Sequence, residues 1–409
     1  MTEALDVEQV RAGFSRFLGA RPERLHAAAH SHHPWPDVTL EAHTGAWLDA
    51  ADRQDHKWER VLGEVLPEFQ GHVARRLGLS DPTTIAVAPN THELVVRLLS
   101  CLLPPGPLAR SAGSCRVLTT DAEFHSFARQ ITRLEEAGLV AVERVAAEPF
   151  EDLPERFRAA AAAGDHQLVF VSQVLFDSGY VVADLVALVD AVPDDDTFVV
   201  VDGYHGYLAL PTDLAAIEGR AFYLAGGYKY AMAGEGSAFL HCPPGYGLRP
   251  LDTGWYAGFS VLTEAGDGRV GYAADGSRFL GATFDPSGLY RANAVHRWLD
   301  DLGVDARNIH AHVRDLQQRF VGAAAGDPRR EALVAGLLPA DVTRDRGNLL
   351  TFRTADAGRL EALLADRDVI VDHRRDRLRI GFGCYHRRED VDELWARLDD
   401  ALLAVATAG

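Results

Sequence analysis

Cysteine is scarce in this chain, and the few cysteines that occur lie far apart. There are four of them, and no two form a C-x-x-C pair: Cys101, Cys115, Cys242 and Cys384. Closely spaced cysteines are the usual sign of a zinc site, and a dense, even number of them indicates a disulfide framework. The scarcity argues against both and favours a reducing, cytoplasmic location.

Long apolar runs and an excess of basic residues are also missing. No stretch of about 18 or more apolar residues occurs, so we expect no membrane span. The start of the chain lacks the basic and apolar regions of a secretory signal. With 41 Lys and Arg against 59 Asp and Glu, the formal net charge is −18. We therefore expect no nucleic-acid or membrane partner, and an anionic ligand needs local cations or backbone amides.

The length and the hydrophobic pattern predict two domains. A chain of 409 residues exceeds one ordinary core. Between residues 83 and 242, apolar strands without strict alternation are separated by helices, which is typical of a mostly parallel sheet covered on both faces. We predict an N-terminal helix within 1–20 that packs with the small domain, a large α/β domain over 21–287 and a small α+β domain over 288–409.

Several polar or aromatic residues directly follow the expected strands, where ligands bind in open parallel sheets. Asn90, Thr91 and His92 open a helix whose free amides could bind phosphate, although a simple N-cap explains them as well. Phe124 could stack on a flat ring or pack in the core. Asp202 and Lys229 each follow a strand that is apolar on both faces.

A buried carboxylate and a buried lysine both require a partner. A simple ion pair between Asp202 and Lys229 is one explanation. A pyridoxal-phosphate site is another, because that cofactor needs a lysine for a Schiff base, an acid at its ring nitrogen, a phosphate cup and a stacking ring. The glycines of "AGGYKYAMAGEG" around Lys229 then predict a close approach of the backbone to the cofactor.

Four stretches resemble a known family, the class V enzymes of the fold-type I pyridoxal-phosphate group: "DAEFHSF", "VDGYHG", "YKYAMAGEGSAFLH" and "VIVDHRRDRLRIGFGCYHRREDVDELW". The chain looks most like kynureninase and is more distantly similar to cysteine desulfurase and isopenicillin N epimerase. The resemblance covers nearly the whole chain. It implies a large domain with a mostly parallel sheet, a smaller α+β domain, pyridoxal phosphate as cofactor and a homodimer with shared active sites.

The resemblance also implies roles for single residues. Lys229 forms the Schiff base and moves protons, and Asp202 pairs with the ring nitrogen. Further cofactor-binding residues are Asn90, Thr91, His92, Phe124, His205, Tyr228 and Thr283. Arg379 is expected to hold the substrate carboxylate through a two-pronged hydrogen bond, and the other substrate-binding candidates are His30, His32 and Tyr256. Tyr256 and Thr283 lie in segments that the partner subunit usually contributes.

Three local features separate this chain from its relatives. One is "AMAGEG" after Tyr-Lys-Tyr, where kynureninases usually have Leu-Asn. The segment "HAAAHSHHPWP" carries His26, His30, His32 and His33, which could line the substrate pocket, bind a metal or lie in a solvated loop. Because no acidic or cysteine ligand is near them, we expect no metal. A desulfurase needs a nucleophilic cysteine on a loop before the substrate arginine, and "RDVIVDHRRDR" has none. Cys384 is interpreted as a packing residue.

The sequence thus predicts a pyridoxal-phosphate enzyme that acts on an amino acid through an external aldimine and a quinonoid. The favoured reaction is kynureninase-like cleavage of a Cβ–C or Cβ–S bond. An aminotransferase or an epimerase on the same scaffold is the alternative. A catalytically silent binding protein is a third reading, and the presence of Lys229, Asp202 and Arg379 together argues against it.

Overall fold

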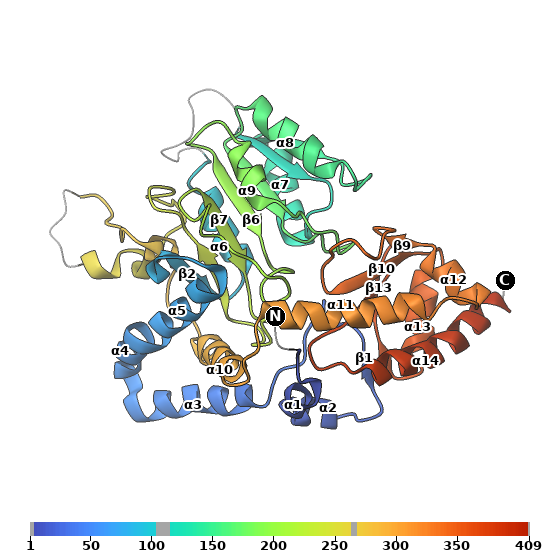
Figure 1. The fold of residues 1–409 in the computed structure, drawn as a ribbon. Helices are drawn as coiled ribbons and strands as arrows, with labels where there is room; N and C mark the ends of the chain where they lie inside the picture. Colours follow the sequence, from blue (N-terminus) through green and yellow to red (C-terminus); the bar gives the residue numbers. More distant parts are fainter. Residues whose placement is uncertain (1–3, 104–114, 263–267, 408–409) are drawn as a thin grey trace.

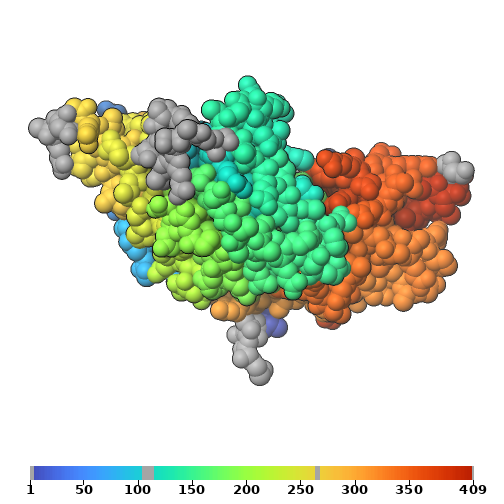
Figure 2. Space-filling model, turned by 90° about the horizontal axis from the view of Figure 1, so that it is seen from above, coloured from blue at the N-terminus to red at the C-terminus, as the bar shows by residue number. Residues whose placement is uncertain are grey.

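The fold is described from a computed structural model, which covers residues 4–103, 115–262 and 268–407. Two hydrophobic cores lie side by side, one around a seven-stranded sheet and one around a four-stranded sheet (Figure 1). Figure 2 shows the second body, in orange and red, projecting from one side of the first. In the part of the chain described here, no helix has the length and apolarity needed to cross a membrane.

The large sheet has the strand order β2-β8-β7-β6-β5-β3-β4. Strands β4, β3, β5, β6 and β7 are parallel, whereas β8 runs antiparallel to both β7 and β2. The bounds are β2 Ile85–Ala88, β3 Cys115–Thr120, β4 Val140–Val145, β5 Leu168–Ser172, β6 Phe198–Asp202, β7 Ala221–Ala225 and β8 Ala238–His241. The mostly parallel sheet predicted from the sequence is confirmed.

Helices pack around this sheet and extend from one end of it (Figure 1). Their bounds are α3 Val38–Arg53, α4 Lys57–Arg60, α5 Leu66–Leu77, α6 Thr91–Leu99, α7 His125–Glu136, α8 Leu153–Ala163, α9 Leu185–Asp190 and α10 Ser287–Asp301. Helix α10 packs along α3, and its buried residues Leu289, Val295 and Leu299 belong to the first core. The helix after residue 287, which the expected boundary assigned to the small domain, therefore shares the large core.

The small body is an antiparallel sheet with four helices. Its strand order is β12-β13-β10-β9, with bounds β9 Leu337–Leu338, β10 Leu349–Arg353, β12 Asp372–Arg374 and β13 Arg377–Gly381. The helices are α11 Ala306–Gly322, α12 Pro328–Val334, α13 Ala357–Ala365 and α14 Arg388–Ala406. The apolar stretch over 368–374 holds two short strands, because Val369–Ile370 forms β11 and pairs with another segment, whereas Asp372–Arg374 forms β12.

The N-terminal segment touches both bodies. Its helices are α1 Val7–Ala12 and α2 Ser15–Gly19, which Gly13 separates, and a Cβ at Gly13 would lie 2.6 Å from the Trp298 ring. Arg11 bonds Asp390 of α14 at 3.1 Å, while Phe14 lies in the large core. Strand β1, Leu25–His26, then pairs in parallel with β11. The segment thus spans the junction between the two cores.

Candidate active site

A cavity of about 200 Å³ opens at the carboxyl ends of the parallel strands. Its lining comes from the residues that follow β2, β3, β5, β6 and β7, as the topology of a parallel sheet requires. Many of the residues singled out from the sequence meet there. The lining includes Asn90, Thr91, His92, Phe124, Ser172, Phe176, Asp202, Tyr204, His205, Tyr228 and Lys229.

Asp202 ends β6, which pairs with both β5 and β7 in the middle of the sheet. Its Oδ1 accepts a hydrogen bond from the backbone N–H of Tyr204 at 2.9 Å. Burial raises the pKa of Asp202, while the Tyr204 N–H and the charge of Lys229 act in the opposite direction. The carboxyl group is thus held by the backbone and exposed to the cavity.

Lys229 lies in the turn after β7, and its side chain is buried. Its Nζ is 2.5 Å from Nε2 of His205 and 5.0 Å from the centre of the Phe124 ring. Burial lowers the pKa of Lys229 to about 7, against the opposing effect of Asp202 and together with that of Arg379. Near neutral pH, much of this amine is therefore unprotonated and nucleophilic.

His205 is the hydrogen-bond partner of the lysine. Burial and the neighbouring charge of Lys229 lower its pKa well below the usual value, so the ring is neutral. With Nε2 accepting from Lys229, the remaining proton lies on Nδ1, and this buried nitrogen has no partner in the described structure. A polar ligand group in the cavity would satisfy it.

The glycines around Lys229 make room for side chains of this chain. A Cβ at Gly226 would lie 2.4 Å from the hydroxyl of Tyr204, and one at Gly227 would lie 2.1 Å from Oγ of Ser237. A close approach of the cofactor to the backbone at these two positions stays a prediction. In the "AMAGEG" half, Met232, Gly234 and Gly236 all have positive φ, a conformation that glycine adopts without strain.

Aromatic rings form the walls of the cavity. Phe124 packs edge-on against Phe176, with centroids 5.3 Å apart and an interplanar angle of 89°. Tyr204 and Tyr228 lie 4.8 Å apart. His32 stacks on Tyr228, with ring centroids 5.0 Å apart. Phe124 and Tyr228 are thus placed where the sequence predicted, whereas Tyr204 and Phe176 were missed.

The start of helix α6 forms the other end of the cavity. Asn90 caps this helix, because its Oδ1 accepts from the backbone N–H of Glu93 at 3.0 Å. The cap leaves the amides of Thr91 and His92 at the first helical positions, where no intrahelical acceptor exists. Both readings of this segment therefore apply together: Asn90 is an N-cap, and the amides beside it suit a phosphate.

Arg379 lies behind the wall that Phe176 forms. Its Nη1 donates to the carbonyl oxygen of Phe176 at 2.6 Å, and its Nε donates to Oδ1 of Asp372 at 2.8 Å. Nη2 bonds the second carboxylate oxygen of Asp372. The Arg379 side chain is 3% exposed, and the partnership with Asp372 was not expected from the sequence.

The four histidines of the N-terminal segment separate. His30 is buried and lies 2.9 Å from Asp372, His26 bonds Tyr385, and His33 bonds the carbonyl oxygen of Pro34. His32 is exposed at the rim, 4.0 Å from Glu235. Neither His30 nor His32 lines the cavity around Lys229. Within the described ranges, no three His, Cys, Asp or Glu residues gather as a metal site requires.

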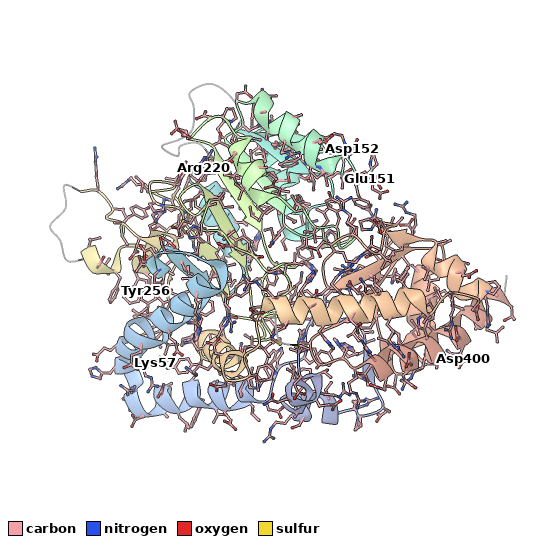
Figure 3. The ribbon with its side chains drawn as sticks, in the orientation of Figure 1. Lys57, Glu151, Asp152, Arg220, Tyr256 and Asp400 are labelled. Atoms are coloured by element: carbon pink, nitrogen blue, oxygen red, sulfur yellow. The ribbon has the colours of Figure 1, made fainter. Side chains whose placement is uncertain are left out.

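Tyr256 and Thr283 lie outside the cavity of their own chain. Tyr256 packs between Trp58 of α4 and Trp255. Figure 3 shows it on the opposite side of the molecule from Asp400, which lies in α14. Thr283 is exposed nearby. A role of either residue at the cofactor stays a prediction that needs a second subunit.

Glu123 is a buried acid that was not predicted as a site residue. Its carboxyl accepts hydrogen bonds from Thr120 at 2.7 Å and from Ser172 at 2.5 Å. Burial raises the pKa of Glu123 to about 7, and the charge of Asp202 adds to this effect. Glu123 directly precedes Phe124. An acidic residue next to the predicted aromatic residue is the sequence feature that could have identified it.

The residues present fit pyridoxal phosphate. In this cavity the partly unprotonated amine of Lys229 would meet the aldehyde, Asp202 the ring nitrogen and Phe124 the ring face. The start of α6 supplies amides for the phosphate, and the unpaired Nδ1 of His205 can bond a polar group of the ring.

Comparison with known proteins agrees with this arrangement. Residues 46–394 match the sequence model of the family "Aminotransferase class-V". The chain therefore belongs to the class-V aminotransferase family, whose cofactor is pyridoxal phosphate. No protein with a curated description matches the sequence significantly.

Solved structures show the same fold. Apo cysteine desulfurase from Thermococcus onnurineus NA1 aligns with a TM-score of 0.77 and 17% identity, over 98% of this chain and 99% of that one. Cysteine desulfurase CsdA from Escherichia coli aligns with a TM-score of 0.75 and 17% identity, over 98% and 100%. A C-DES mutant with glycine covalently linked to its PLP cofactor has a TM-score of 0.75 and 17% identity, over 95% and 99%. Identities this low establish the fold, and the kynureninase-like specificity stays a prediction.

Proposed function

We propose that this protein is a pyridoxal-phosphate lyase that acts on an amino acid and cleaves a Cβ–C or Cβ–S bond in the kynureninase manner. The observation that carries the proposal is the position of Lys229, Asp202 and Phe124. All three line one cavity at the carboxyl ends of the strands, and Arg379 lies behind Phe176. When bound, pyridoxal phosphate supplies an aldehyde and an electron-accepting ring.

Lys229 binds the aldehyde and moves protons in this proposal. Its lowered pKa of about 7 makes the amine both a nucleophile and a base near neutral pH. Its Nζ bonds neutral His205, which lines the same cavity. Asp202, at the end of β6, would hold the ring nitrogen in its protonated form, which favours electron withdrawal from the substrate Cα.

The state of the cysteines supports a lyase over a desulfurase. All four are buried, and burial raises the pKa of Cys101, Cys242 and Cys384 to about 12 and that of Cys115 to about 11. Thiols in such surroundings stay protonated and are poor nucleophiles. C-DES, one of the proteins that share the fold, is described as a cystine C–S lyase.

The experiment that tests the proposal is incubation of the holoenzyme with L-kynurenine, cysteine S-conjugates and cystine. Release of alanine, or of pyruvate with ammonia, is expected. The matched control is Lys229→Ala, which should release neither product. If wild-type protein forms no product from any of these compounds and its cofactor absorbance does not change, the proposed lyase reaction is wrong.

An aminotransferase is the second candidate, since the matched family carries that name. It would convert the cofactor to its pyridoxamine form on addition of an amino acid, and a keto acid would restore the original spectrum. The same incubations therefore separate the two reactions. Racemisation of the recovered amino acid would instead indicate an epimerase.

We also propose that two copies associate with shared active sites. The exposed large apolar side chains of the described residues include two groups: Leu40, Trp47 and Leu48 on α3, and Leu248, Leu251, Trp255, Phe259 and Leu262 before residue 263. Exposed apolar groups of this size are typical of interaction surfaces. Sedimentation should give the mass of a dimer, and Trp47→Glu with Phe259→Glu should shift it toward a monomer. A monomeric wild-type protein would contradict this proposal.

A further inference from the structure

The hydrogen bonds of Arg379 are unevenly distributed around its guanidinium. An arginine has five N–H donors. Asp372 takes one from Nε and one from Nη2, and the carbonyl oxygen of Phe176 takes one from Nη1. Two donors are left, one on each terminal nitrogen. A carboxylate that bridges the two terminal nitrogens needs one donor on each of them.

The partnership with Asp372 is built into the hairpin of the small domain. Strands β12 and β13 are antiparallel, and their register places Asp372 directly opposite Arg379. Side chains at directly opposed positions lie close enough to interact. The geometry of the pair therefore follows from the backbone and does not depend on a mobile loop.

His30 is a further hydrogen-bond partner of the Asp372 carboxylate, in addition to Arg379. Its Nε2 is 2.9 Å from Oδ1 of Asp372. Although burial opposes the effect, His30 and Arg379 hold the pKa of Asp372 below its usual range. An ionised carboxylate can only accept, so Nε2 of His30 is the donor. A Cβ at Gly381 would lie 2.1 Å from Nδ1 of His30, so Gly381 is needed for the ring to reach Asp372.

The charge of Asp372 nearly cancels that of Arg379. A second cation, Arg374, lies 3.5 Å from Asp372, and 42% of its side chain is exposed. The remaining positive charge therefore lies partly on an exposed side chain, and Asp372 weakens the attraction of Arg379 itself for an anionic substrate. The direction of the two unused N–H groups is what remains to recognise a carboxylate.

We propose that Asp372, held by His30, is a positioning residue that fixes Arg379 so that its two unused N–H groups face the substrate carboxylate. This inference rests on the proposed function, because it requires an amino-acid substrate. The opposite account is that Asp372 only competes with the substrate for Arg379. The two accounts differ in sign: loss of the Asp372 charge weakens carboxylate binding in the first and strengthens it in the second.

The test is equilibrium titration of wild-type and Asp372→Asn holoenzyme with L-alanine and with ethylamine, which lacks the carboxylate. Binding is followed by the absorbance of the cofactor. We expect the Kd for L-alanine to rise about ten- to hundredfold, the effect of one lost hydrogen bond to a charged group, while the Kd for ethylamine stays the same. An unchanged or lower Kd for L-alanine in Asp372→Asn overturns the inference alone. If wild-type enzyme responds to neither compound, the proposed function fails, and the inference fails with it.

Variants of His30 provide a second measurement that does not depend on the folding of Asp372→Asn. The side-chain amide of His30→Gln can place a nitrogen donor near the position of Nε2, whereas His30→Leu cannot. We expect His30→Gln to keep the wild-type Kd for L-alanine and His30→Leu to raise it with no change for ethylamine. Equal Kd values for L-alanine in the two variants would overturn the role of His30.

Discussion

Nζ of Lys229 and Nε2 of His205 lie 2.5 Å apart, and both side chains are buried. Two cations cannot share this position at low cost, because like charges disfavour each other. Burial lowers the pKa of both residues. The charge of Lys229 lowers that of His205 further, whereas Asp202 opposes and Arg379 adds to the lowering at Lys229. The pair therefore works with a neutral imidazole and a lysine that loses its proton near neutral pH.

The rate of cofactor loading should depend on pH through Lys229. Below its pKa of about 7 the amine is protonated, so the rate of binding of pyridoxal phosphate to apoenzyme should rise with pH and level off above pH about 7. Stopped-flow absorbance measures this rate. A soluble lysine derivative with an ordinary pKa of about 10.4 is the control, and its rate should keep rising at higher pH. A protein profile that parallels this control would contradict the lowered pKa.

Replacement of Asp202 by Asn should impair catalysis more than cofactor binding. The substitution keeps the size of the side chain and removes the charge expected at the ring nitrogen. We expect kcat to fall by roughly 10²–10³, the typical effect of removing one preorganised electrostatic group. Steady-state kinetics measures it, with Asp196→Asn as the matched control at an exposed position just before the same strand. Equal kcat values in the two variants would remove Asp202 from the mechanism.

Exchange of Arg379 for Lys should raise KM for a carboxylate-bearing substrate, because lysine cannot present a planar pair of donors. Arg375→Lys, at the exposed turn of the same hairpin, is the control. An unchanged KM would mean that another cation binds the carboxylate. Arg278 is unsuited, since it donates to the backbone carbonyls of Pro243, Tyr246 and Asp275, and Arg374 would then be tested next.

The cysteines should resist thiol reagents in the native protein. All four are buried with raised pKa values, and the thiolate is the reactive form. We expect no rapid reaction with a disulfide reagent under native conditions and reaction of all four thiols in denaturant. One fast-reacting thiol in the folded enzyme would reopen the desulfurase mechanism.

The parallel sheet and the residues at its carboxyl edge could be predicted because the signals are local. The apolar runs that end at Asp202 and before Lys229 are strands buried on both faces, and such strands bring their end residues together. The stretch over 368–374 was harder. It reads as one strand, but its first half pairs with β1 and its second half with β13. Local hydrophobicity carries no information about a change of partner.

Asp372 illustrates what local patterns miss. Its partner Arg379 is seven positions away, and their contact depends on the hairpin register. The short turn between β12 and β13 lacks the Asn-Gly or Asp-Gly pair that marks most tight hairpins. The contacts of the histidines could not be predicted either, because only the fold shows that His30 contacts Asp372 and His32 contacts Tyr228.

The N-terminal segment makes this enzyme sensitive to a single break in the chain. Phe14 is part of the large core, Leu25 is part of the small core, and Trp35 lies against Gly234 in the turn after Lys229. A protease cut between Phe14 and Leu25 would leave the strands of both large sheets intact. It would break the covalent link between Phe14 in the large core and the strand that precedes His30, and so weaken the contact of His30 with Asp372. Limited proteolysis should therefore inactivate the enzyme early, before either domain is degraded.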